Sequence, residues 1–199
     1  MNPSMSSFFF FLSLICFLTL LPCPIISARP ASTLAAASPV DLLTKACSLA
    51  PNKDLCQQTI NSAKDKPKKD LNDLAFIAFE AASIASTSNA EFVSQKLEDI
   101  EESEEPDDVV VTQSFQDCQE QYQGMNDEVD DAVSALATRR RDDDGKIETW
   151  LKDSIVAVET CQKSATGKGQ KTDELTGMNQ KLLELLNNAM AVFQVLKQN

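Results

Sequence analysis

The chain has 199 residues, a length that suits one domain of ordinary size, and its formal net charge is −12. So acidic a protein is repelled by nucleic acid and by anionic membrane surfaces, whereas a basic protein is attracted to it. The sequence has no histidine, which removes serine–histidine and cysteine–histidine catalytic sites and the usual zinc ligand sets. Its five glycines form no phosphate-binding motif. The composition therefore argues against an enzyme, a cofactor or a metal.

Residues 1–28 are predicted to be a secretory signal peptide. Ser6 to Ile26 is almost wholly apolar, Pro22 and Pro24 break the run, and Ala28 supplies a small residue for the peptidase. A membrane anchor is the alternative, because about 18 apolar residues nearly span a bilayer. The two prolines favour the signal peptide. We therefore expect a secreted protein with no membrane segment after cleavage.

The mature chain is expected to begin with a flexible leader over residues 29–37, followed by one domain over residues 38–199. That domain starts with a short helical hairpin over residues 38–63. Ser38-Pro39 is typical of a helix start, with a side-chain cap followed by proline at the first helical position. A turn at Pro51-Asn52 separates the two short helices, and a polar linker follows the second.

Four long amphipathic helices are predicted over residues 69–198. Apolar residues recur every three or four positions, and no segment with a strand-like period competes with them. The predicted buried positions are Leu71, Leu74, Ile77, Ala78, Ala81, Ile84, Ala85, Phe92, Leu97 and Ile100 in the first helix; Phe115, Cys118, Tyr122, Met125, Val129, Ala132 and Leu136 in the second; Ile147, Leu151, Ile155, Val158 and Cys161 in the third; and Leu175, Met178, Leu182, Leu185, Ala189, Val192 and Leu196 in the fourth. The predicted class is all-α, an up-down-up-down four-helix bundle preceded by a helical hairpin.

Four cysteines remain after signal removal, and an even count in a secreted chain indicates two disulfides. Cys47 and Cys56 lie across the hairpin turn, while Cys118 and Cys161 lie on the apolar faces of consecutive antiparallel helices. We therefore expect the pairs Cys47–Cys56 and Cys118–Cys161, which would stabilise the fold by about 2–3 and about 4 kcal/mol. The other two connectivities, which would tie the hairpin to the bundle, remain alternatives.

No catalytic residue is predicted from the abundant carboxylates. The segment 142–145, Asp-Asp-Asp-Gly, is superficially like a calcium loop, but that loop would need acidic residues where Arg140 and Leu151 stand. A solvated turn is the better interpretation. Tyr122 and Trp150 lie on or beside apolar faces, so both are predicted to belong to the core.

Three segments have a recognisable order and spacing. They are the Cys47–Cys56 pair within short helices, the run Phe115-Gln116-Asp117-Cys118-Gln119-Glu120-Gln121-Tyr122, and Thr149-Trp150-Leu151 leading to Thr160-Cys161. In these segments the chain resembles the plant invertase/pectin methylesterase inhibitor family. The resemblance implies a four-helix bundle behind a helical hairpin, with disulfides joining the first cysteine to the second and the third to the fourth. It also implies an apoplastic, cell-wall protein that blocks a carbohydrate-active enzyme.

The chain departs from the family pattern near its contact surface. Lys152-Asp153-Ser154-Ile155 replaces small residues, and no Gly-Phe follows Cys161. Family inhibitors of acid invertase carry a Pro-Lys-Phe loop between the helices that hold the third and fourth cysteines. Here that loop reads Arg-Arg-Arg-Asp-Asp-Asp-Gly-Lys over residues 139–146. Together with Thr149-Trp150-Leu151, this favours pectin methylesterase as the target.

The expected mode of action is a one-to-one complex in which a monomeric bundle covers the enzyme's cleft without a covalent step. Acidic residues would speed the encounter with a basic isoform, and salt would weaken it. The expected contact residues lie off the apolar faces of the second and third long helices: Asp127, Asp130, Asp131, Glu148 and Lys152. Cell-wall or vacuolar acid invertase is the alternative partner. A helical carrier of an apolar ligand is a second alternative, although such carriers commonly have six cysteines.

Overall fold

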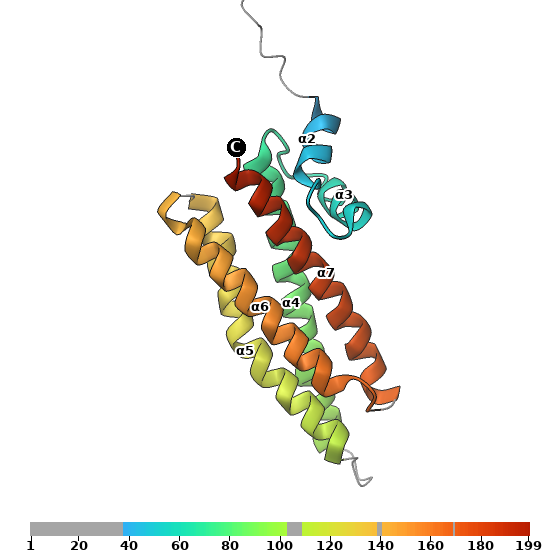
Figure 1. Cartoon of the computed structure of the whole chain (residues 1–199). Coiled ribbons are helices and arrows are strands. Elements are labelled where there is room, and N and C mark those ends of the chain that lie inside the picture. Colours follow the sequence, from blue (N-terminus) through green and yellow to red (C-terminus); the bar gives the residue numbers. More distant parts are fainter. Residues whose placement is uncertain (1–37, 103–108, 139–140, 169) are drawn as a thin grey trace, which may run out of the picture. The chain divides into compact units, whose positions relative to one another are not determined.

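The computed structural model describes residues 38–102, 109–138, 141–168 and 170–199 (Figure 1). Its elements are α2 (Pro39–Ala46), α3 (Lys53–Ser62), α4 (Leu71–Glu101), α5 (Val109–Thr138), the 3₁₀ turn η1 (Arg141–Asp143), α6 (Asp144–Ala165) and α7 (Gln170–Lys197). Every regular element within the described residues is helical, and two disulfides are present, so the predicted all-α class is confirmed. The predicted signal peptide and leader lie outside the described residues.

The hairpin of α2 and α3 is capped and then fixed to the bundle. Side-chain oxygens of Ser38 and Asn52 accept hydrogen bonds from the first turns of α2 and α3. A disulfide joins Cys47 to Cys56, with 5.9 Å between their Cα atoms. The backbone N–H of Asn52 donates to Oδ1 of Asn188 in α7 at 3.3 Å, and Nδ2 of Asn188 donates to the Asn52 carbonyl at 3.1 Å. The turn of the hairpin is therefore bonded directly to the last helix.

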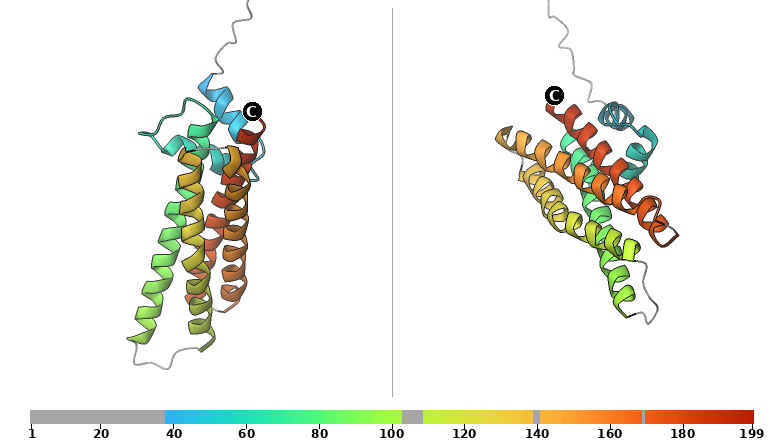
Figure 2. Two further views of the ribbon diagram at one scale, coloured as in Figure 1. Left: turned by 90° about the vertical axis from the view of Figure 1, so that its left-hand side faces the viewer. Right: turned by 60° about the horizontal axis from the view of Figure 1, so that its bottom comes forward.

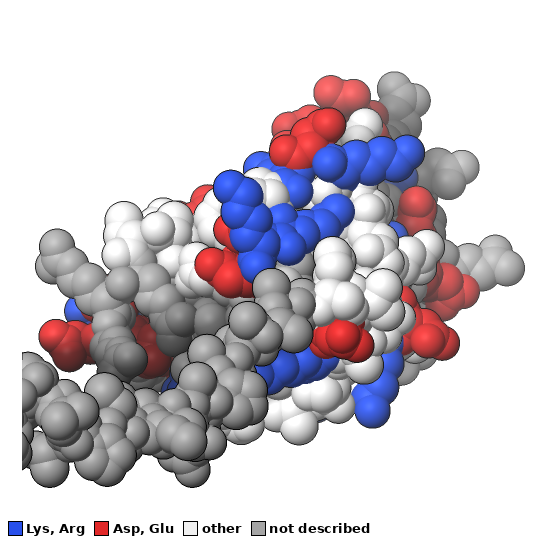
Figure 3. Space-filling view, turned by 90° about the horizontal axis from the view of Figure 1, so that it is seen from above, with Lys and Arg blue, Asp and Glu red and all other residues white. Residues whose placement is uncertain are grey.

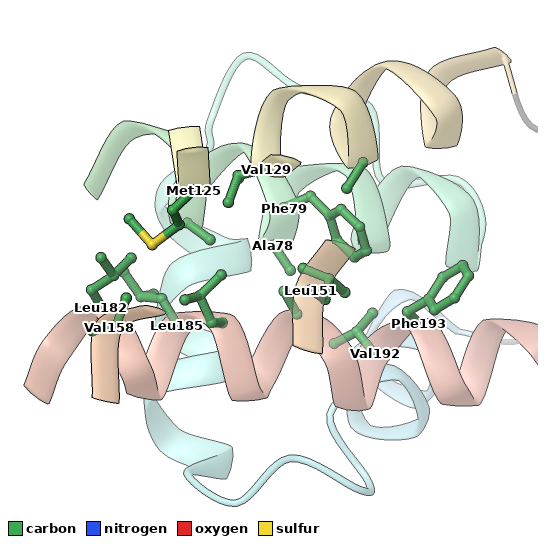
Figure 4. Close-up of a cluster of buried hydrophobic side chains, with 14 of the residues drawn as sticks. Ala78, Phe79, Met125, Val129, Leu151, Val158, Leu182, Leu185, Val192 and Phe193 are labelled. Atoms are coloured by element: carbon green, nitrogen blue, oxygen red, sulfur yellow. The ribbon is translucent and has the colours of Figure 1, made fainter. Parts of the chain in front are cut away.

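Helices α4 to α7 form an antiparallel bundle in which α4 and α6 each pack against both α5 and α7 (Figures 1 and 2). The Cys118–Cys161 disulfide joins α5 to α6, with 4.6 Å between Cα atoms. Figure 4 shows apolar side chains of the bundle helices turned toward one another. Among them, the rings of Phe79 in α4 and Phe193 in α7 meet edge to face at 5.9 Å. Among the described helices, none combines the length and the apolar character needed to cross a bilayer.

The buried face of α4 differs from the predicted one. Ile84 is 63% exposed and Ala81 is only half-buried, whereas Ala82, Ser86 and Asn89 are buried. The prediction for this stretch was wrong because alanines occur on several faces of α4. The spacing of apolar residues alone therefore does not show which face is buried. The predicted face of α5, which is built from large residues, is buried at all seven positions and is confirmed.

Smaller shifts of the same kind occur in α6 and α7. Ser154 is buried where Ile155 was predicted, and Asn179 is buried where Met178 was predicted, while the two apolar residues are half-buried. In both helices a polar residue adjacent to the predicted position turns inward. Buried polar groups require hydrogen-bond partners, and both residues have them.

Candidate protein-binding surface

The polar residues inside the bundle form a network that holds the four helices together. Tyr122 of α5 donates its hydroxyl hydrogen to Oδ1 of Asn179 in α7. The same hydroxyl accepts from Nδ2 of Asn89 in α4 at 3.1 Å, and Nδ2 of Asn179 lies 3.0 Å from Sγ of Cys161 in α6. Burial raises the pKa of Tyr122 to about 12, so its phenol stays neutral. The network is closed to solvent and offers no free nucleophile.

The described residues also bring no three acidic or cysteine side chains together in a way that would hold a metal ion. What the bundle presents to other molecules is its surface, and charge is divided unequally over that surface. Helices α4 and α5 together contain twelve Asp and Glu residues and a single basic residue, Lys96. Helices α6 and α7 contain seven acidic and six basic residues. The α4–α5 side therefore carries most of the negative charge of the bundle.

The hairpin and the α3–α4 linker differ from both halves of the bundle in having more basic than acidic residues. Residues 38–70 contain six lysines and four acidic residues. Lys and Arg side chains, with Asp and Glu between them, gather on the end of the molecule that Figure 3 shows. One of the linker lysines, Lys66, pairs with Glu80 of α4 at 2.8 Å and lies 5.8 Å above the ring of Phe76. The negative charge of the whole chain is thus not spread evenly, and a basic partner is attracted to one side.

Three of the five predicted contact residues lie on the acidic side. Asp127 and Asp131 are exposed, and their four-residue spacing places both on the same face of α5. Asp130 turns toward α4, where the Ser83 hydroxyl donates to its Oδ1 at 2.7 Å. These three aspartates, which we call the α5 acidic trio, form one continuous patch.

The structure places the other two predicted contact residues elsewhere. Glu148 of α6 accepts from Nζ of Lys152 at 2.7 Å and from Nζ of Lys197 in α7 at 2.6 Å. The hydrogen bonds from Lys152 and Lys197 lower the pKa of Glu148 to about 2. Glu148 and Lys152 therefore lie along the side of α6 that faces α7, and the five residues do not share one face.

Glu128 is a residue with unusual electrostatics that sequence reasoning missed. It is half-buried and lies at the seam between α5 and α6, near Asp153 and Ser154. Loss of solvent raises its pKa, repulsion by Asp153 adds to the rise, and a hydrogen bond with Ser154 opposes it. The sequence holds no signal for this site, because only the packing of α5 on α6 brings the two carboxylates together.

Residues 41–192 match the family model described as plant invertase/pectin methylesterase inhibitor. The proteins of this family are inhibitors and not enzymes. In sequence, the chain matches no curated protein at a significant level.

Two crystal structures resemble the structure described above. One is mutant form A of a pectin methylesterase inhibitor from Arabidopsis, with a TM-score of 0.63 and 13% identity over 76% of this chain and 95% of that one. The other is a pectin methylesterase inhibitor from Arabidopsis thaliana, with a TM-score of 0.56 and 14% identity over 79% of this chain and 97% of that one. The TM-scores show a shared fold, and at such low identities the likeness shows the fold alone.

Proposed function

Because the chain belongs to the plant invertase/pectin methylesterase inhibitor family, we propose that it inhibits a pectin methylesterase by binding over the enzyme's active-site cleft. The family match over residues 41–192 carries this proposal. The α5–α6 segment supports the choice of target, because residues 139–146 contain no Pro-Lys-Phe sequence. Its described part is the short 3₁₀ turn η1 running into α6, with Lys146 paired to Asp143 at 3.2 Å.

Inhibition by a preformed surface requires a rigid protein, because ordering a surface during binding reduces affinity. Several features support such rigidity here. Disulfides hold both the hairpin and the α5–α6 pair, and Asn188 bonds the hairpin turn to α7. The polar network around Tyr122 links all four bundle helices. The proposed mechanism is therefore docking of a folded monomer in a one-to-one complex that excludes substrate, with no covalent step.

The α5 acidic trio is the proposed centre of electrostatic contact. Its carboxylates lie on the side of the bundle where negative charge is concentrated, so they would accelerate encounter with a basic enzyme. Glu148 and Lys152 are already paired with each other and with Lys197. We assign them to a second, smaller contact or to fixing the end of α7. The predicted signal peptide supports secretion, with the apoplast as the proposed site of action.

The test is a titration of the refolded mature protein, with both disulfides formed, into separate assays of a plant pectin methylesterase and an acid invertase. We expect methyl-ester hydrolysis to fall to its residual value near one equivalent of inhibitor while sucrose hydrolysis is unchanged. Loss of invertase activity alone would reverse the assignment of the target. Loss of neither activity, over several isoforms of each enzyme, would overturn the proposal.

A carrier of an apolar ligand would need an empty apolar space inside the bundle. Along the described helices, that space is occupied by large, fully buried side chains, which include Phe79, Phe115, Tyr122 and Phe193. Their packing supports an inhibitor that acts through its exterior.

A further inference from the structure

Two adjoining hollows follow the seam between α4 and α5, the pair of helices that Figure 2 shows side by side along their length. The first, of about 430 Å³, lies nearer the middle of the bundle and is lined by Thr87 and Asn126 among others. The second, of about 280 Å³, continues toward the end of α4 and is lined by Gln116 and Gln119 of α5. Ser94 and Glu98 line both hollows, so the two form one continuous depression, which we call the α4–α5 groove.

Small side chains on α4 produce this groove. Ala90 and Ser94 lie on the α4 side of the seam, and their side chains are too short to fill the space in front of α5. Ser86 and Asn126, hydrogen-bonded to each other, and Ser83 and Asp130 join the two helices further along the same seam. The groove therefore begins where these hydrogen bonds along the outer side of the seam end, and it runs on from the α5 acidic trio.

The chemistry of the groove is that of a receptor for a cationic peptide segment. Hydroxyl and amide side chains line it, and these groups can both donate to and accept from a peptide backbone. Glu91, Glu98 and Glu101 add three carboxylates, and among the described residues no Lys or Arg side chain lines either hollow. Lys96, the one basic residue of the two helices, is instead 3.4 Å from Asp99 and 5.5 Å above the ring of Phe92.

The three glutamates of the groove form no ion pair with a Lys or Arg among the described residues, in contrast to Glu148. We propose that the α4–α5 groove receives an extended segment of the target enzyme that carries Lys or Arg side chains. This inference rests on the proposed function and deepens it by naming a second contact and its chemistry. The two hollows, of about 430 and 280 Å³, adjoin along the seam and are open to solvent. An extended segment fits this form better than a globular protrusion.

The lining also bears on other classes of ligand. Sugar rings commonly stack on aromatic side chains, and no described residue that lines the groove is aromatic. Phe92, an aromatic residue of α4 between Glu91 and Ser94, packs against Phe115 of the core, with 6.4 Å between ring centroids. An acidic polysaccharide would moreover be repelled by the glutamates. A cationic protein segment is therefore the occupant that both the charge and the lining favour.

The first experiment compares matched charge changes on two sides of the bundle. The groove variant is Glu91→Gln/Glu98→Gln/Glu101→Gln. The control is Glu159→Gln/Asp173→Asn/Glu174→Gln, which removes three exposed carboxylates from α6 and α7. Against a basic plant pectin methylesterase at low salt, we expect the groove variant to bind about tenfold more weakly and the control less than about twofold. Equal losses in the two variants would overturn the groove while leaving the inhibitor function intact.

A second pair of variants tests shape without changing charge. Ser94→Trp fills the groove at the residue shared by both hollows, while Thr160→Trp places the same side chain on the exposed surface of α6. We expect Ser94→Trp to weaken binding about tenfold and Thr160→Trp to leave it unchanged. Helical circular dichroism and the unfolding midpoint check that both variants fold. Unaltered binding by a folded Ser94→Trp protein would overturn the proposal.

A third measurement does not depend on any enzyme. The isotope-labelled mature protein is titrated with an acetylated octapeptide of alternating Lys and Ser, and with a Glu–Ser peptide of equal length. Shifts of the side-chain amides of Gln116, Gln119 and Asn126 with the lysine peptide alone support the groove, even if neither proposed target enzyme is inhibited. Chemical-shift changes of equal size at exposed carboxylates all over the molecule would overturn the groove as a specific site. Selective shifts with oligogalacturonate would assign the groove to a polysaccharide instead.

Discussion

The α4–α5 pair and the α6–α7 pair have the same kind of interior but different exteriors. Both pairs bury small and apolar residues at the bundle axis, and both contribute to the network around Tyr122. On α6 and α7 acidic and basic residues are nearly balanced, and Glu148 is held between Lys152 and Lys197. Helices α4 and α5 together contain twelve Asp and Glu residues and one lysine. The comparison shows that one half of the bundle is nearly neutral, whereas the other half has a large net negative charge that a partner can neutralise.

Like charges kept on one side repel one another and destabilise the folded state. The two halves must therefore be held together by interactions other than surface ion pairs. A covalent link, Cys118–Cys161, and a buried polar link, Asn89–Tyr122–Asn179, both cross from the acidic half to the balanced half. If surface charge is reserved for binding, stability should depend mainly on these two links.

The largest expected effect is the loss of the covalent link. Cys118→Ala/Cys161→Ala should lower the free energy of unfolding by about 4 kcal/mol, because the disulfide closes a long loop in the unfolded chain. Cys47→Ala/Cys56→Ala, which opens only the short hairpin loop, should cost about 2–3 kcal/mol. Guanidinium unfolding followed by circular dichroism measures both. A greater loss from the hairpin pair would show that the hairpin, and not the α5–α6 link, limits stability.

The buried polar link should rank next. Tyr122→Phe removes the hydroxyl that donates to Asn179 and accepts from Asn89, so it leaves these two buried amides with only their mutual 3.4 Å hydrogen bond and the Cys161 sulfur as partners, and it should cost about 1–3 kcal/mol. Urea unfolding measures this loss. A cost below about 0.5 kcal/mol would show that the two asparagines bond to each other well enough without the phenol.

The same residue gives a pH dependence with a defined sign. Burial raises the pKa of Tyr122 from 10.0 to about 12, so the folded state favours the neutral phenol. Its contribution to stability is complete below pH 10 and is lost as the pH rises toward about 12. Tyr122 is the only tyrosine in the chain, so phenolate absorbance reports it alone. Ionisation near pH 10 with the fold intact would contradict the buried network.

The sequence predicted the parts of this architecture that large side chains determine. All seven predicted positions of α5 are buried, because Phe115, Tyr122 and Met125 select one face without ambiguity. On α4, alanine and serine occur on several faces, so Ile84 was predicted to be buried although it is exposed, and Asn89, which is buried, was not among the predicted positions. Small residues leave the choice of face to the packing of neighbouring helices.

The candidate binding surface was less predictable than the fold. Sequence spacing identified Asp127, Asp130 and Glu148 as lying off the apolar faces, but it does not specify which neighbouring helix each residue meets. Asp130 bonds to Ser83 on α4, whereas Glu148 bonds to Lys197 on α7. The α4–α5 groove could not be predicted from the sequence for the same reason, because it depends on which residues of the two helices lie opposite each other.

Neutralising the α5 acidic trio tests whether the acidic half is reserved for binding. Asp127→Asn/Asp130→Asn/Asp131→Asn should weaken association with a basic pectin methylesterase about tenfold at low salt, mainly through a slower association rate. The difference should shrink as salt is raised, because exposed charges are screened. Surface plasmon resonance over a salt series measures both effects. An unchanged association rate at low salt would exclude these aspartates as steering groups.

The smallest effect should come from the ion pairs of the balanced half. Glu148 has its pKa lowered to about 2 by hydrogen bonds from Lys152 and then Lys197, so its contribution to stability is present above its usual pKa of 4.5 and is lost as the pH falls toward about 2. The site is partly exposed, so Glu148→Gln should cost no more than about 1 kcal/mol near neutral pH and little at pH 2. Glu91→Gln on the acidic half, which removes a carboxylate with no ion pair to a described Lys or Arg, should cost nothing measurable at either pH. Unfolding curves of both variants at pH 7 and pH 2 test the comparison directly, since it fails if the two substitutions behave alike.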